Sequence, residues 1–274
     1  MNTKKVCGIL GLVVLVAALV ALPGVAKAEM YVEAYIGGSW AADSKESNSF
    51  TNPGGMGGVV NNSLSGAIDT SVHGGAKLGT WFVKEGFLGY DYPDWMKYLG
   101  FYLDISYNKV DFRRARGSST TTIPGLGATY RNQFFSEGNA ITLAFMFAGR
   151  YGFLPDSEVP FGRLQPYVAV GPAVLWTQQE PKFSIYAIDP AVNNYTLKQG
   201  GASNTTVICL AAEAGVRYMA LKNVSVGISF KYRYAEPSFD FTMPENILPY
   251  GGKSFKFDPT YHLFSGQFGV AYHF

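Results

Sequence analysis

The residues best suited to catalysis are a histidine and a serine near the C-terminal end of the chain. His262 and Ser265 lie three residues apart, and a serine nucleophile needs a histidine base within hydrogen-bonding reach. Successive side chains of an extended strand point to opposite faces, so this odd spacing separates the pair. We therefore predict no catalytic residues. The other histidines, His73 and His273, lack neighbours at metal-ligand spacing, so we predict neither a metal nor a cofactor.

Charged residues that alternate with apolar ones form a second candidate group. Its members are Glu33, Lys77, Asp104, Glu213, Arg217, Lys231 and Arg233. Both signs of charge come from separate segments, and a buried charge without a partner costs several kcal/mol. If these segments enclose an interior, we expect the charges to pair and fill it as a polar network. The alternative is a path for ions or protons, which a narrow interior disfavours.

A third candidate is a basic segment. Arg113, Arg114 and Arg116 precede a stretch of serine, threonine and glycine, and Arg131 follows it. Arginine binds phosphate through paired hydrogen bonds, so these residues could contact phosphate groups of a ligand at the surface. The alternative is a solvated polar loop without a ligand.

The elements that carry these residues have a period of two. Alternation of apolar with polar or small residues predicts eight strands, at 31–40, 72–82, 99–109, 140–151, 163–176, 206–220, 224–234 and 264–274. Pro172 in the fifth cannot donate a ladder hydrogen bond, which predicts a β-bulge. The long connections 41–71, 110–139, 177–205 and 235–261 alternate with shorter ones. Long outer loops and short inner turns are typical of bacterial membrane barrels. The first long loop is rich in Gly, Asn and Ser, which favours mobility.

The two ends of the chain predict its destination. Lys4 and Lys5 precede an apolar run, and the Ala26-Lys27-Ala28 pattern follows it, so we predict a secretory signal peptide over residues 1–28 and a barrel domain over 29–274. The last strand has apolar and aromatic residues at alternate positions. These are Phe268, Val270, Tyr272 and Phe274, and we expect them to form the signal read by the barrel-assembly machinery.

Composition excludes other classes. Removing the three lysines of the predicted signal peptide from the formal net charge of +2 leaves −1, so nothing indicates nucleic-acid binding. Only Cys209 lies beyond the predicted signal, so no internal disulfide can form there. Aromatic residues make up 15% of the chain, which suits strands that meet lipid at the membrane interfaces. The predicted fold class is all-β: an eight-stranded antiparallel up-and-down transmembrane β-barrel.

Five segments resemble the outer membrane protein β-barrel domain family, the small OmpA/OmpX-type barrels. They span residues 77–82, 100–107, 162–172, 224–233 and 268–274. The resemblance implies a barrel in the bacterial outer membrane, in contact with its lipid and lipopolysaccharide, and no active site common to the family. We therefore expect a non-enzymatic structural or cell-surface interaction role through four long outer loops, with the extracellular ligand unknown. The alternatives are a narrow channel for small solutes and a lipid-modifying outer-membrane enzyme.

Overall fold

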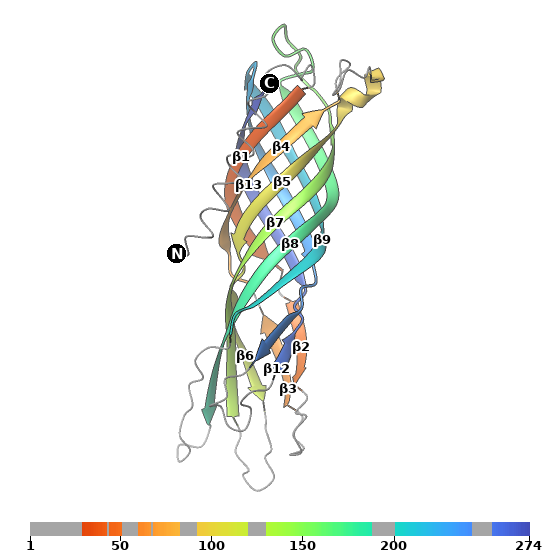
Figure 1. Cartoon of the computed structure of the whole chain (residues 1–274). Coiled ribbons are helices and arrows are strands. Elements are labelled where there is room, and N and C mark those ends of the chain that lie inside the picture. Colours follow the sequence, from red (N-terminus) through yellow and green to blue (C-terminus); the bar gives the residue numbers. More distant parts are fainter. Residues whose placement is uncertain are drawn as a thin grey trace, which may run out of the picture.

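Eight antiparallel strands close into a barrel (Figure 1). The computed structural model describes residues 29–42, 44–50, 60–66, 68–82, 92–119, 130–187, 201–242 and 254–274; the predicted signal peptide lies outside them. The barrel strands are β1 (Glu29–Ala41), β4 (Ser71–Trp81), β5 (Leu99–Lys109), β7 (Tyr130–Arg150), β8 (Leu164–Ala187), β9 (Ser203–Leu221), β10 (Val224–Ala235) and β13 (Tyr261–His273). Each pairs with the next in chain order, and β13 pairs with β1, so the predicted fold class is confirmed.

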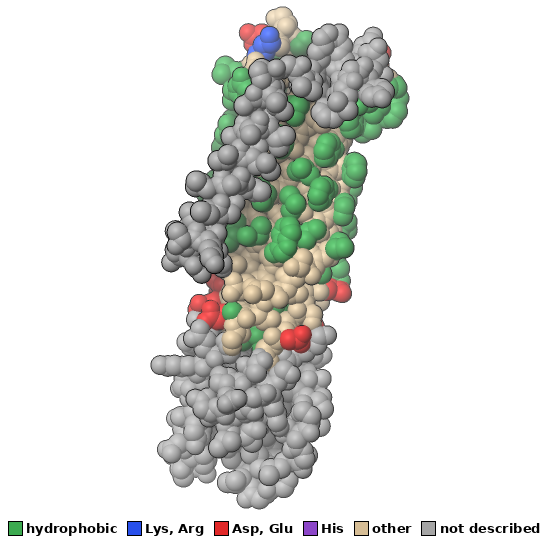
Figure 2. Space-filling view, in the orientation of Figure 1, with side chains coloured by type: hydrophobic (Ala, Val, Ile, Leu, Met, Phe, Trp, Pro, Cys, Tyr) green, Lys and Arg blue, Asp and Glu red, His purple; other side chains and the backbone are tan. Residues whose placement is uncertain are grey.

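The alternation of side chains explains why this sheet closes on itself. Along β5 the burial pattern switches at every residue, with Tyr102 and Asp104 buried and Phe101 exposed on the opposite face. Closure leaves no free strand edge, so each backbone group can find a partner inside a membrane. The exposed face carries large apolar side chains such as Ile208, which is 78% exposed. Figure 2 shows these side chains spread as a green band over the barrel wall. This apolar band is the surface that lipid covers, and the protein is a transmembrane barrel.

Aromatic residues border the band at both ends. Near the C-terminus the exposed rings are Tyr151, Phe153, Tyr218, Tyr272 and Phe274, and near the opposite end they are Trp40, Tyr107 and Trp176. Two such girdles mark the membrane interfaces of outer-membrane barrels. We call the end with the C-terminus and the short turns the inner end, and the opposite end the outer end.

The outer connections contain strands that the sequence pattern did not predict. β2 (Ser44–Phe50) pairs with β3 (Val60–Gly66), and β11 (Phe239–Thr242) pairs with β12 (Ser254–Phe257). β6 (Phe112–Ser119) pairs with the outer part of β7, which in turn pairs with the outer part of β8. Figure 1 shows β2, β3, β6 and β12 projecting from the outer end. Within the described residues, each of the four expected long loops therefore contains paired strands.

The bulge predicted at Pro172 is wrong. Ala144 pairs with Ala173, and Phe147 pairs with Val170, so the antiparallel register between β7 and β8 is the same on both sides of the proline. On its other side Pro172 lies in an unbroken register with Leu210. The proline is exposed on the lipid face, where its ring adds apolar surface. Loss of one ladder hydrogen bond therefore does not require an extra residue.

The inner end is closed by short connections. Lys222 and Asn223 form the turn between β9 and β10, and the connection between β4 and β5 ends in a short 3-10 helix, η2 (Asp94–Tyr98). Trp95 of this helix is exposed, and Tyr98 stacks on Tyr151 with ring centroids 5.7 Å apart. Within the described residues, no helix has the length and apolarity required to cross a membrane.

Candidate functional site

The structure brings the seven inward-facing charged residues into the middle of the barrel. Glu33, Lys77 and Asp104 lie in register across β1, β4 and β5, so their side chains enter the interior at one level. The Lys77 ammonium donates hydrogen bonds to Glu33 (2.8 Å) and to Glu213 across the barrel (2.6 Å). Arg217 donates to the other oxygen of Glu33 at 2.6 Å. All of these side chains are buried, so their charges are stabilised by one another rather than by water.

Glu213 is the acceptor that joins the most strands. Besides Lys77 it accepts hydrogen bonds from the hydroxyls of Tyr167 (2.6 Å) and Tyr102 (3.1 Å) and from the Gln267 amide (3.3 Å). The Lys231 ammonium lies 3.5 Å from its second oxygen. Hydrogen bonds to an ionised acceptor are stronger than neutral ones. This carboxylate therefore ties β4, β5, β8, β10 and β13 to β9 through the interior.

Asp104 forms the second centre of the network. Its carboxylate accepts a close hydrogen bond from Lys231 and one of 2.5 Å from the Tyr35 hydroxyl. The Lys77 ammonium also lies 5.0 Å from the centroid of the Tyr35 ring, a distance that suits a cation–π contact. Tyr35 thus contacts Asp104 through its hydroxyl and Lys77 through its ring.

Arg233 is the exception among the seven, because no described carboxylate pairs with it. Its guanidinium donates to the side-chain oxygens of Asn108 (3.1 Å), Thr142 (3.0 Å), Ser265 (3.3 Å) and Ser106 (3.5 Å). All of these partners are neutral. The network therefore has a cation at its outer side that neighbouring acids do not neutralise.

A separate cluster occupies the inner end of the interior. Arg150 is buried, forms a two-pronged ion pair with Glu29, and donates to Gln165 at 3.1 Å. Its guanidinium lies 4.2 Å from the ring centroids of both Trp81 and Phe161, between the two. A planar cation between two aromatic faces fills the opening at this level.

The connection between β7 and β8 at the inner end, residues 151–163, carries an exposed acid whose pKa the fold changes. We call this connection the inner turn. Asp156 accepts hydrogen bonds from the backbone N–H groups of Val159 (2.7 Å) and Glu158 (3.0 Å). It also accepts a close one from the Arg163 side chain. The Val159 N–H, followed by the Arg163 hydrogen bond, holds the pKa of Asp156 below its ordinary value.

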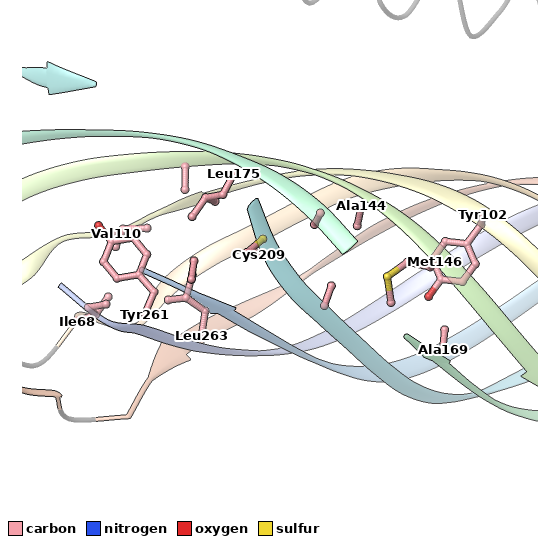
Figure 3. Packing of buried hydrophobic residues seen from close by; sticks show 14 of the residues in the cluster. Ile68, Tyr102, Val110, Ala144, Met146, Ala169, Leu175, Cys209, Tyr261 and Leu263 are labelled. Atoms are coloured by element: carbon pink, nitrogen blue, oxygen red, sulfur yellow. The ribbon is translucent and has the colours of Figure 1, made fainter. Parts of the chain in front are cut away.

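The outer end of the interior is apolar. Phe112, the first residue of β6, packs edge-on against Phe257 with ring centroids 5.4 Å apart. Its ring centroid lies 6.0 Å from that of Tyr261. Phe239 and Phe241 of β11 are also buried, and Phe239 stacks on Phe257 at 6.2 Å. Figure 3 shows Ile68, Val110, Tyr261 and Leu263 grouped together, away from Tyr102, Met146 and Ala169 further along the barrel. We call the cluster of Ile68, Val110, Phe112, Phe239, Phe241, Phe257, Tyr261 and Leu263 the outer stopper.

One buried amide fixes the outer stopper to the barrel wall. Gln179 of β8 donates to the Val110 carbonyl and to the Tyr261 hydroxyl, both at 3.0 Å, and accepts from Ser136 at 2.6 Å. These bonds satisfy a polar group that would otherwise be costly among aromatic rings. The described interior is therefore filled at three levels: the Arg150 cluster, the charged network and the outer stopper.

The other sequence candidates are not brought together. His262 is partly exposed on the outer face and hydrogen-bonds with the Tyr232 hydroxyl at 2.9 Å, whereas Ser265 is buried in the interior beside Arg233. The parity argument against a serine–histidine pair is therefore correct. In the described part of the chain, no group of three potential ligands could hold a metal ion.

Two predicted sets of surface residues are placed less fully. Arg113, Arg114 and Arg116 lie on β6, and Arg131 lies on β7, but their side chains are outside the part that the structure describes. Phe268, Val270 and Tyr272 are exposed on the lipid face of β13. Phe274 directly follows β13, and its backbone N–H donates to the Met30 carbonyl at 2.9 Å.

Several interior residues escaped the sequence analysis. Tyr31, Tyr35 and Tyr167 were not selected because aromatic residues in a membrane strand are expected at the lipid interface. Their even spacing from Glu33 on β1, and from Ala169 on β8, was the signal that assigns them to the interior. The Arg150 and Glu29 pair was missed because each residue lies at the end of a strand, where alternation gives no information.

Comparison with known proteins shows a shared fold and nothing more specific. No family model matches the chain, and no curated protein matches it. Among solved structures, the outer membrane protein OprG from Pseudomonas aeruginosa is 13% identical and has a TM-score of 0.51, with 90% of this chain and 97% of that chain covered. A major outer membrane protein from Thermus thermophilus is also 13% identical, with a TM-score of 0.45 and coverage of 91% and 100%. The chain thus has the fold that its five segments implied, that of the small eight-stranded β-barrels of the bacterial outer membrane.

Proposed function

We propose that the protein is a closed, non-enzymatic barrel that presents extended β-hairpins at the cell surface as an interaction platform. The observation that carries this proposal is that buried side chains occupy the described interior at three levels. The buried Arg150, the charge network around Glu213 and the outer stopper each occupy a level of the lumen. An interior filled with paired side chains serves rigidity rather than passage.

The hairpins at the outer end support the same proposal. β7 and β8 continue far beyond the apolar band as paired strands, and β6 joins them at one edge. Rigid scaffolds that carry long connections commonly bind through those connections. We therefore place the interaction surface on the β2–β3 and β6–β7–β8 extensions.

Lipopolysaccharide is the ligand that the sequence of β6 favours. Arg113, Arg114 and Arg116 supply three guanidinium groups within four positions of an outer hairpin, and guanidinium groups bind phosphate well. Replacing all three with Ser should weaken binding to purified lipopolysaccharide, with the larger difference at low salt, where exposed charges are least screened. Arg163→Ser is a matched control, because it removes an arginine from the inner turn. Equal binding by the wild type and the triple variant would eliminate the phosphate hypothesis.

A deletion strain tests the platform itself. A barrel with the β2–β3 and β6–β7–β8 extensions shortened should fold and insert but should not restore the phenotype of the intact protein. Restoration by the shortened barrel would move the function to the wall or the interior. A narrow channel would then be the better candidate, since the middle of the lumen is lined by polar groups.

A further inference from the structure

Arg233 is a buried cation that the charge network does not neutralise. The buried charges at the middle of the described barrel are three carboxylates, of Glu33, Asp104 and Glu213, and four cations, of Lys77, Arg217, Lys231 and Arg233. The first three cations form ion pairs with the three carboxylates, and Arg233 has no ion pair with any described residue. A guanidinium removed from water without a counter-charge carries a large desolvation cost. A counter-ion is therefore missing from the protein's own side chains.

The surroundings of Arg233 consist of neutral hydrogen-bond acceptors and small side chains. Its partners on β5, β7 and β13 are hydroxyls and one amide. Across the ladder it faces Ala211 of β9, and Ala144 and Ala173 are buried on the strands beyond. Asp104, two residues before Ser106 on β5, is already bonded to Lys231 and Tyr35. Serine and threonine hydroxyls can rotate to donate, so the site can receive negative charge.

A second, independent observation comes from atoms that lack partners at the same level. His73 is fully buried and lies in register with Asn108, which accepts a hydrogen bond from Arg233. The atoms at this level without a described partner within hydrogen-bonding distance are both ring nitrogens of His73, the buried Nε of Arg233 and the amide oxygen of Gln267, which lies beside His73. Buried polar groups are nearly always satisfied by protein, water or an ion. The free Nε–H of Arg233, on a charge that no described acid neutralises, indicates a missing acceptor.

We propose that Arg233 and His73 form an internal site for one small monovalent anion, such as chloride, held by the guanidinium, an imidazole N–H and the surrounding hydroxyls. The excess of one positive charge sets the charge of the ligand, because a divalent anion would create a new imbalance. The buried position favours a compact, weakly hydrated ion over an organic carboxylate. Such an ion completes the interior as a structural counter-ion, independently of any surface ligand.

Halide-dependent stability tests the site. The barrel is refolded in detergent, and its thermal unfolding midpoint is measured in sodium chloride, sodium bromide and sodium gluconate at equal ionic strength. A halide at roughly 100 times its dissociation constant should raise the midpoint by about 5–10 °C over gluconate. Arg233→Met should abolish this difference. Arg163→Met, which removes an arginine from the inner turn, should retain it.

Crystals grown in bromide locate the ion directly. The wild type should give an anomalous peak within hydrogen-bonding distance of Arg233 and His73, and Arg233→Gln should lack it. If Arg233→Met does not fold, His73→Phe in the same halide series provides the second variant. A wild type whose midpoint is the same in gluconate and halide would overturn the proposal, as would a site occupied by water alone in bromide crystals. An equal halide response in wild type and variants would do the same.

Discussion

Replacing Glu213 removes the acceptor on which the charged network converges. In Glu213→Gln, Lys77 keeps only Glu33 as an acidic partner, and Lys231 keeps only Asp104. The interior then carries a second excess positive charge. Removal of one partner from a buried pair costs roughly 3–5 kcal/mol, because an uncompensated charge remains in a poorly solvated site. A change of that size lowers the equilibrium constant for folding by roughly a factor of 10²–10⁴.

The assay is equilibrium unfolding in urea with the barrel inserted in lipid vesicles, read from tryptophan fluorescence and the heat-resistant gel band. Glu158→Gln is the matched control, since its side chain is 61% exposed at the inner turn, and it should leave the midpoint unchanged. The double variant Glu213→Gln with Lys77→Met removes one charge of each sign. It should be more stable than the sum of the single effects predicts, because the second excess charge is gone.

The result that would refute the reasoning is equally specific. If Glu213→Gln unfolds at the wild-type urea concentration, water reaches the network and the side chains are not paired in a dry interior. If the double variant is simply additive, Glu213 and Lys77 do not act as one ion pair. Either outcome would remove the main support for a closed lumen.

Three further perturbations test other levels of the barrel. Arg150→Ala should lower the free energy of unfolding by about 3 kcal/mol in the urea assay, because Glu29 loses its cation at the inner end; an unchanged midpoint would contradict this. Deletion of Phe274 should reduce the amount of folded protein in outer-membrane fractions, and normal accumulation would show that the terminal aromatic residue is not part of the assembly signal. The lowered pKa of Asp156 means that its hydrogen bonds stabilise the inner turn fully above the ordinary pKa of the acid and are lost as pH falls through the lowered value. The amide NMR shift of Val159 should follow that titration and should become insensitive to acid in Asp156→Asn.

The barrel itself could be predicted because every membrane-spanning strand must satisfy the same alternation of residue types. A membrane strand must present apolar residues to lipid and polar or small ones to the interior, so a period of two recurs across eight segments. The same parity correctly placed Asp104 and Lys231 inside and separated His262 from Ser265. These successes depend only on which face of a strand a residue occupies.

The extensions and the Pro172 region could not be read in the same way. Outside the membrane both faces of a strand meet water or other protein, so β6 and the outer parts of β7 and β8 need no alternation. At Pro172 the rule that proline requires a bulge failed, because pairing on the two sides of the residue preserves the register. The sequence pattern indicates a face, whereas these features depend on long-range pairing.

The interior contacts could be predicted only in part. Parity predicted which charges face the lumen, but not that Glu213 would be the common acceptor or that Arg233 would lack an acid. Those facts depend on the stagger of strands far apart in sequence. The outer stopper was also not predicted, because the alternation that places Phe239 and Phe257 in strands extends over only four residues in each. These residues are buried because the pairing of β11 with β12 packs them into the cluster at the outer end.

Single-channel recording in planar lipid bilayers tests the central claim that the barrel is closed along its length. With the Arg150 cluster, the charged network and the outer stopper in place, the wild type should show no sustained conductance in molar salt. A variant that combines Arg150→Ala, Glu213→Ala and Lys77→Ala with removal of the β11–β12 hairpin removes side-chain volume at all three levels, and should conduct if it inserts. Steady open-channel currents from the wild-type protein would contradict the account and make passage through the lumen its function.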